Sequence, residues 1–191
     1  MDDYLVPGRE CGDCMVCCIE PAIPGYGLDK PTRTACANCS GGGCAIYASR
    51  PQVCHEYLCL WRRLPFLDDA WRPDRSGVMI DPAGNAEGTP NNYAVELMIA
   101  GTPELVETER FAGLVAGFVA SGTGVFLNVP GGPGEPARMT RLHDWVIDPV
   151  QRRDLAGVID GIRGCYATIV AADLPSGPDT AAAGRGGDGS R

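Results

Sequence analysis

The sequence is poor in positive charge and in histidine. It has 16 Lys and Arg residues against 24 Asp and Glu residues, which gives a formal net charge of −8, and Lys30 is its single lysine. Affinity for nucleic acid rests largely on Lys and Arg that neutralise phosphates, so we expect no nucleic-acid partner. His55 and His143 are the only histidines. A catalytic zinc site with three histidines is therefore excluded.

Signals for export and for membrane insertion are also missing. Asp2 and Asp3 stand where a secretory signal needs basic residues. The longest uncharged stretch, 111–134, contains several glycines and two prolines, which a membrane-spanning helix tolerates poorly. We expect a cytoplasmic protein with no membrane partner. In that reducing compartment structural disulfides are rare, so a disulfide-rich secreted protein is the least favoured alternative.

Common catalytic templates are absent from the sequence. It contains no Gly-rich dinucleotide or phosphate loop, no G-x-S-x-G, no H-E-x-x-H and no EF-hand run. The catalytic residues are therefore unknown, and activity as an iron–sulfur oxidoreductase stays an open alternative.

What the sequence does contain is cysteine. Nine of its 10 cysteines lie between positions 11 and 59. Two-residue spacers let a short loop present two sulfurs to one ion, with backbone N–H groups pointing at the thiolates. In a reducing compartment this density indicates metal binding. The candidate metal ligands are Cys11, Cys14, Cys17, Cys18, Cys44, Cys54 and Cys59, with Cys36 and Cys39 as the less firm ones.

Nine sulfurs divide in more than one way. Two four-thiolate sites leave one sulfur spare, whereas a multinuclear cluster with bridging thiolates uses all nine. Cys17 and Cys18 are neighbours, and neighbouring side chains point about 100° apart around a helix, so they serve different ions or one of them bridges. An all-thiolate site suits both zinc and an iron–sulfur cluster. His55 is a less favoured ligand.

The cysteine spacing resembles a known family. The run C-x2-C-x2-C-C at 11–18, followed by G-C-x-I-Y at 43–47, R-P-x2-C at 50–54 and Cys59, resembles the bacterial cysteine-cluster family described as a zinc- or iron-chelating domain. A similar segment occurs in flagellin lysine N-methylase. The resemblance covers roughly residues 11–61 and implies metal chelation without naming a reaction. It also suggests an accessory role in protein methylation, which the missing cofactor fingerprint disfavours.

Arginines near the cysteines can offset the charge of a metal–thiolate site. A tetrathiolate zinc site carries a net charge of −2, and nearby guanidinium groups stabilise it through the field or through hydrogen bonds to sulfur. We expect Pro51 to start a helix that carries Cys54 to the cluster while Arg50 stays near the sulfurs. The candidate arginines are Arg9, Arg33, Arg50, Arg62 and Arg63.

The pattern of residues changes after about residue 75. Residues 1–75 show little apolar periodicity, so we expect a segment that metal binding organises. We expect residues 76–173 to form a small α+β unit and residues 174–191 to form a disordered tail. The fold class is α+β, with the irregular Cys-rich segment packed on the small unit. The elements expected are a strand at 77–81, a turn at 81–85, a strand at 93–99, a helix from Pro103 capped by Thr102 and followed by Gly122, a strand at 125–129, and a long helix opening at Asp148-Pro149.

Apolar spacing predicts which side chains form the core. Cys165 lies on the apolar face of the last helix, where a free cysteine behaves as a small hydrophobic residue. Gly157, Gly161 and Gly164 would allow close approach on another face of that helix, and His143 is expected in a loop. The predicted packing residues are Phe111, Leu114, Val115 and Phe118 on the first helix, Leu155, Val158, Ile159, Ile162, Cys165, Tyr166, Ile169 and Val170 on the last, and Trp61, Trp71 and Trp145.

These features predict a metal-binding cysteine-cluster protein, with zinc or an iron–sulfur cluster as its cofactor. A redox function in electron transfer to an unidentified protein partner is one hypothesis. The other is a structural zinc module that presents the α+β unit for protein–protein interaction.

Overall fold

The structure is a computed structural model that describes residues 5–25 and 28–172 of the chain, so the predicted tail at 174–191 lies outside the described residues. The fold is α+β, as predicted, with a four-stranded mixed sheet and a long C-terminal helix. Its elements are α1 (Val16–Ile19), η1 (Tyr47–Ser49), α2 (Gln52–Glu56), η2 (Leu60–Arg62), η3 (Asp69–Trp71), α3 (Pro73–Ser76), β1 (Val78–Gly84), β2 (Ala94–Ile99), η4 (Pro103–Glu107), α4 (Glu109–Ala120), β3 (Gly124–Val129), β4 (Arg138–Arg141), α5 (His143–Gln151) and α6 (Leu155–Ala171).

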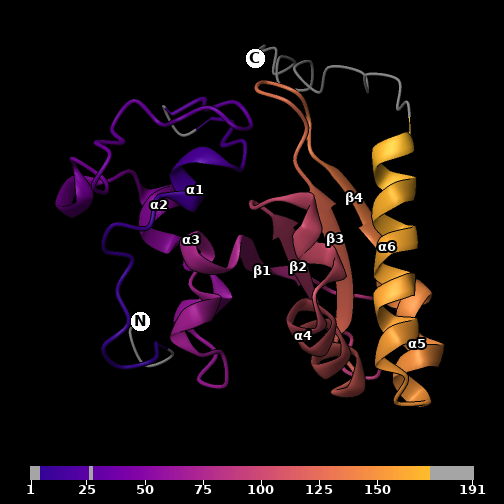
Figure 1. Cartoon of the computed structure of the whole chain (residues 1–191). Coiled ribbons are helices and arrows are strands. Elements are labelled where there is room, and N and C mark those ends of the chain that lie inside the picture. The colour runs from indigo at the N-terminus through magenta and orange to yellow at the C-terminus, as the bar shows by residue number, and fades with distance from the viewer. Residues whose placement is uncertain (1–4, 26–27, 173–191) are drawn as a thin grey trace, which may run out of the picture.

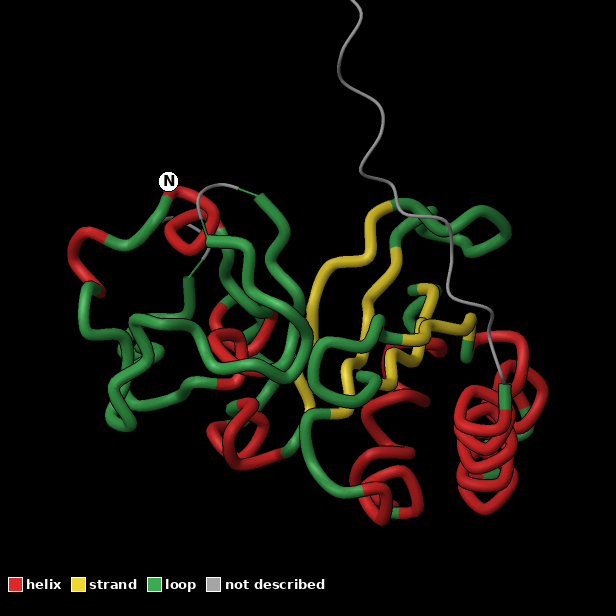
Figure 2. Tube along the Cα trace, turned by 90° about the horizontal axis from the view of Figure 1, so that it is seen from above, coloured by secondary structure: helices red, strands yellow, loops and turns green. Residues whose placement is uncertain are grey.

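The four strands lie in sequence order in the sheet. β1 and β2 pair antiparallel, which confirms the predicted hairpin, and β3 and β4 also pair antiparallel. β2 and β3 run parallel. Parallel neighbours need a crossover connection, and α4 provides it. Figures 1 and 2 show the Cys-rich segment on one side, next to β1, and α5 and α6 on the opposite side.

The main core lies between one face of the sheet and the helices. Alternate strand residues point to the same face, and on β1 these are Val78 and Ile80, both buried in the core. The four predicted apolar residues of α4 are all buried. On α6 the buried residues are Val158, Ile162, Cys165 and Ile169, whereas Leu155 and Val170 are exposed.

The second half of the Cys-rich segment joins this core. Trp61 and Trp71 are buried, as predicted, and belong to the same cluster of apolar side chains as the sheet. Arg9 holds the connection, because its guanidinium donates to the carbonyls of Trp61, Leu64 and Leu67. The start of the Cys-rich segment is thereby tied to η2 and to the loop that follows it.

The predictions for the strands need two corrections. The turn expected at 81–85 is wrong, because β1 continues to Gly84 with a shift of register between Pro82 and Gly84. Proline is tolerated there because β1 is an edge strand and the ladder is already irregular. β4 was not predicted, since the sequence of its four residues, R-M-T-R, shows no clear alternation of apolar and polar side chains.

The predicted helix starts are also wrong. Pro103 opens only the short 3₁₀ helix η4, and α4 begins after Thr108, whose Oγ1 accepts a hydrogen bond from the Phe111 N–H at 3.2 Å. Pro149 lies inside α5. The cap of the last helix is Asp154, which accepts from the Gly157 N–H at 2.9 Å. α4 and α6 each have a capping residue of the expected type, but a few residues later in the chain than predicted.

α5 packs closely against α6 at small residues. A Cβ added at Gly161 would lie 2.6 Å from the Trp145 carbonyl oxygen, and one at Gly164 would lie 3.1 Å from the Trp145 ring. Trp145 is nevertheless 42% exposed, so its place is at the surface and not in the core. His143 was expected in a loop but is buried in the first turn of α5. None of the helices in the described residues is long and apolar enough to cross a membrane.

Candidate metal centre

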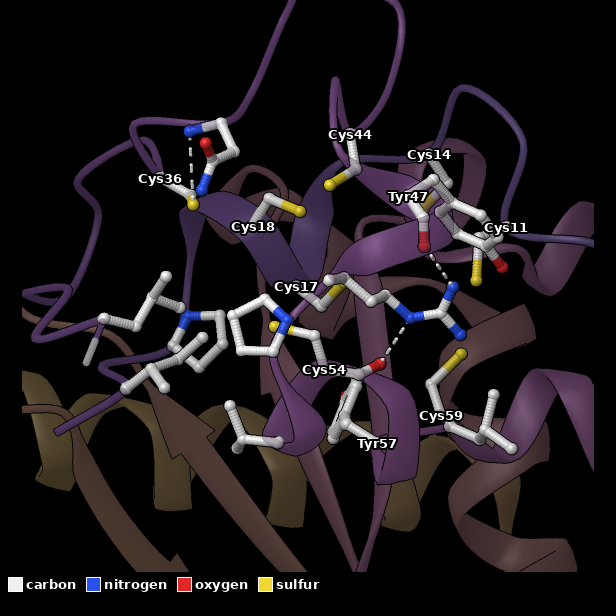
Figure 3. Close-up of a pocket in the computed structure, with 18 of the residues that line it drawn as sticks. Cys11, Cys14, Cys17, Cys18, Cys36, Cys44, Tyr47, Cys54, Tyr57 and Cys59 are labelled. Atoms are coloured by element: carbon white, nitrogen blue, oxygen red, sulfur yellow. Dashed lines mark hydrogen bonds between the residues drawn. The ribbon is translucent and has the colours of Figure 1, made fainter. Parts of the chain in front are cut away.

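Eight of the nine candidate cysteines line a single cavity of about 370 Å³. They come from separate parts of the chain that the fold brings together beside β1 (Figure 3). Apolar side chains, including Ile23, Val53 and Met79, complete the wall. Apolar walls keep water away and strengthen electrostatic interactions inside the cavity. The cysteines in the wall are Cys11, Cys14, Cys17, Cys18, Cys36, Cys44, Cys54 and Cys59.

The first four cysteines lie on a tight turn and a short helix. The N–H of Cys14 donates to the Cys11 carbonyl at 2.9 Å, and Gly12 between them has a φ of +54°. The backbone N–H of Val16 favours the thiolate form of Cys14, although burial raises the pKa of that thiol. α1 then carries Cys17 and Cys18. This is the knuckle geometry that the two-residue spacing predicts, with an N–H pointing at sulfur.

A glycine turn joins the middle cysteines. Cys39 and Cys44 pair through an isolated antiparallel bridge, and Gly41 and Gly43 between them have φ values of +79° and +131°. The backbone N–H of Asn38 lies 3.5 Å from the Cys36 sulfur, which gives a second knuckle.

Cys39 differs from the other candidates. It is not among the residues that line the cavity, and its sulfur lies 3.1 Å from the Met15 sulfur. The structure therefore brings eight predicted ligands together and places the ninth to one side.

The last two cysteines are carried by α2 and by the start of η2. Pro51 precedes the first helical residue of α2 and is its N-cap. Arg50 donates from Nε to the Cys54 carbonyl and from Nη1 to the Tyr47 carbonyl, both at 3.0 Å. The Arg50 side chain thus braces α2 by binding carbonyl oxygens, and it lines the same cavity as the sulfurs, as predicted.

Arg62 is the arginine that contacts a thiol. Its Nη1 lies 3.7 Å from the Cys11 sulfur. Its Nε is buried, and within the described residues that atom has no hydrogen-bond partner. A buried donor without a partner costs free energy, and a thiolate ligand in this cavity would supply the missing acceptor. The sequence named Arg62 only as one of five candidates.

Lys30 was missed as a site residue. It is only 4% exposed, and its Nζ donates to the carbonyls of Ile19, Pro31 and Thr34 at 2.8–3.1 Å. Three carbonyls satisfy the three donors of an ammonium group. Burial lowers the pKa of Lys30, while the charges of Cys18 and Cys36 oppose that shift. The available signal was its occurrence as the only lysine in an arginine-rich chain.

Burial favours the protonated form of several of these thiols when no metal is present. Burial raises the pKa of Cys59 to about 12 and also raises the pKa values of Cys14 and Cys54. A hydrogen bond between Cys17 and Cys18 raises the pKa of Cys17 and lowers that of Cys18. Metal ligation needs thiolates, so binding of a metal here would release protons.

A buried polar pair lies beside the cavity. The Tyr57 hydroxyl, from the cavity wall, donates to Asp81 Oδ1 on β1 at 2.5 Å. Burial raises the pKa of Asp81 to about 6 and raises that of Tyr57 well above its usual value. This pair connects the Cys-rich segment to the sheet. His55 and Glu56, by contrast, are exposed on α2 and do not line the cavity.

The donor set fits a thiophilic metal. All 10 cysteines are free thiols. Within residues 5–25 and 28–172, no group of three or more His, Cys, Asp or Glu side chains is close enough together to hold an ion as placed. The sulfurs thus share a cavity without forming a finished coordination sphere. Eight soft donors with N–H groups and a guanidinium nearby suit zinc or iron–sulfur ligation.

Comparison with family models, with curated proteins and with solved structures finds no match to this chain. The resemblance to the cysteine-cluster family therefore stays a prediction that depends on the spacing at 11–61.

Proposed function

We propose that the protein is a metal-binding cysteine-cluster protein whose N-terminal segment binds zinc or an iron–sulfur cluster through thiolates. The observation that carries the proposal is the convergence of eight thiols on one largely apolar cavity. Free cysteines scattered by chance have no reason to meet in one place, whereas ligands must. The buried, unpartnered Nε of Arg62 and the N–H groups directed at Cys14 and Cys36 add support.

Zinc would supply structural stability, and an iron–sulfur cluster would in addition supply an electron carrier. The chain's own residues serve either group in the same way. The cavity walls are largely apolar, backbone N–H groups point at sulfur, and Arg62 places positive charge at Cys11. We propose a cytoplasmic protein that acts on or with a protein partner.

A structural zinc module is the second candidate, and one observation favours it. Among the described residues before Leu60, no apolar side chain is fully buried. The segment therefore has little hydrophobic core of its own, and coordination would supply the missing stability. An accessory role in protein methylation has no comparable support in the cavity.

Purification without air, followed by elemental analysis and absorption spectroscopy, tests the proposal. A brown protein that dithionite bleaches supports an iron–sulfur cluster, and a colourless protein with bound zinc supports the structural module.

Paired variants show whether the cysteines hold the metal. We expect Cys14→Ser to lower the metal content and Cys165→Ala to leave it unchanged, since Cys165 is buried in the core on α6. Equal loss of metal in the two variants would contradict the proposal.

A further inference from the structure

The eight cysteines of the cavity separate into two groups. In the first, Arg62 links Cys11 to Cys59. Its Nη1 lies 3.7 Å from the Cys11 sulfur, and its backbone N–H donates to the Cys59 carbonyl at 3.0 Å. Figure 3 shows the sulfurs of Cys11 and Cys59 turned toward each other at one end of the cavity. Cys14 belongs with them through the turn hydrogen bond to Cys11.

The second group lies at the other end of the cavity. The N–H of Cys36 donates to the Cys18 carbonyl at 2.9 Å. Figure 3 shows the sulfurs of Cys18 and Cys44 away from those of Cys11 and Cys59. Cys54, on α2, lines the same cavity and would complete this group.

Cys17 and Cys18 mark the division between the groups. Both are on α1, where successive side chains point about 100° apart. Cys17 follows Cys14 with the same two-residue spacing that separates Cys14 from Cys11. Cys17 therefore belongs to the first group and Cys18 to the second.

Each group has its own cation. Arg62, with its unpartnered Nε, serves the first group. Lys30 serves the second, because its Nζ binds the carbonyls of Ile19 and Thr34, which lie next to Cys18 and near Cys36 in the chain. A four-thiolate site with a divalent ion carries excess negative charge, and a cation beside each site offsets part of it.

We propose that the cavity holds two separate metal centres. Cys11, Cys14, Cys17 and Cys59 bind the first, Cys18, Cys36, Cys44 and Cys54 bind the second, and Cys39 binds neither. This assignment rests on the proposed function and goes further, because it fixes the number of centres and the ligands of each. Cys39 is excluded because its sulfur faces Met15 and lies outside the cavity wall.

Thiol mapping on the wild-type protein tests the assignment without any substitution. The protein isolated without air is treated with iodoacetamide under native conditions, and each cysteine is quantified by peptide mass spectrometry. We expect the eight ligands to be protected and Cys39 to be alkylated. Removing the metal with a chelator should expose the eight ligands to the reagent, while Cys165 stays protected by burial as long as the sheet is folded. Protection of Cys39 together with alkylation of Cys36 would overturn the assignment.

Metal content of variants tests the division into two centres. Under a fixed challenge with a competing chelator, Cys59→Ser should lose about half of the bound metal and Cys44→Ser should lose about the other half. Cys39→Ser is the matched control and should keep all of it. Complete loss of metal in both Cys59→Ser and Cys44→Ser, with the α+β unit still folded, would indicate one compound cluster and overturn the division, although the proposed function would stand. A wild-type protein free of metal would overturn the proposed function itself.

Discussion

The two parts of the molecule use different means to hold their shape. Within the described residues, every buried apolar side chain lies at Leu60 or later in the chain, on the segment before β1, on the sheet and on the helices that follow. Before Leu60 the buried residues are Gly43 and the polar Lys30 and Thr32. The comparison teaches that hydrophobic burial accounts for the second region and leaves the first unexplained. Cysteine thiols, which metal coordination would need, are what the first region has in abundance.

Removing the metal should have the largest effect and should divide the two regions. A structural zinc ion contributes about 10–16 kcal/mol in small zinc domains, so the Cys-rich segment should lose its structure when a chelator strips the protein. Hydrogen exchange followed by mass spectrometry should show loss of protection across residues 5–59 and retained protection in β2 and α4. Equal protection of residues 5–59 before and after the chelator would contradict this expectation.

A substitution that leaves a cavity in the main core should destabilise the α+β region and leave the Cys-rich segment unchanged. Phe111 is fully buried under the sheet, and Phe111→Ala should lower the free energy of unfolding of the α+β region by about 3–5 kcal/mol. Chemical denaturation measures this change, and elemental analysis of the same samples should show unchanged metal content. Loss of metal in Phe111→Ala would mean that the two regions depend on each other.

The contact between α5 and α6 allows a finer test within the second region. Gly161→Ala should lower the free energy of unfolding by about 1–3 kcal/mol, because the new Cβ would lie 2.6 Å from the Trp145 carbonyl oxygen. Gly113→Ala on α4 is the matched control, since nothing lies within 4 Å of its added Cβ. That variant should be stabilised by about 0.5–1 kcal/mol, because alanine is the better helix former. Thermal unfolding compares both with the wild type, and equal effects would argue against close helix packing.

A pH dependence with a defined sign should give the smallest effect. Burial lowers the pKa of His143, so the folded state keeps its imidazole neutral. As the pH falls through about 6.5, the unfolded chain binds the proton more readily, and the free energy of unfolding decreases.

Replacing His143 isolates this effect from the other titrations. The decrease in stability between pH 7 and pH 5.5 should be smaller in His143→Gln than in the wild type, as measured by urea denaturation. His55→Gln, on the exposed surface of α2, is the control and should behave as the wild type. Asp81 acts in the opposite direction, because burial raises its pKa to about 6 and the folded state gains from its protonation as the pH falls.

The difference between the two regions also decides how much of each could be predicted from the sequence. The α+β class, the first hairpin and the apolar face of α4 follow from periodicity, because burial imposes a period on the residues. The helix starts were misplaced, since Thr102 and Asp148 match the capping pattern as well as Thr108 and Asp154 do. β4 was missed because its residues are not apolar enough to show a period.

In the Cys-rich segment the spacing identifies the cysteines but not their partners. Contacts such as the backbone hydrogen bond between Cys36 and Cys18 depend on how the loops fold in space. The separate position of Cys39 could not be predicted either, because its two-residue spacing from Cys36 is the pattern expected of a ligand pair. The acceptors of Lys30 are backbone carbonyls, which every residue has. No pattern of side chains in the sequence could therefore predict this site.

Elemental analysis of the protein, isolated without air and without chelators and combined with hydrogen exchange of residues 5–59, tests the central claim most directly. Coordination as the source of structure in this region predicts bound zinc or iron together with protected amides. A metal-free protein with the same region fully protected would contradict it.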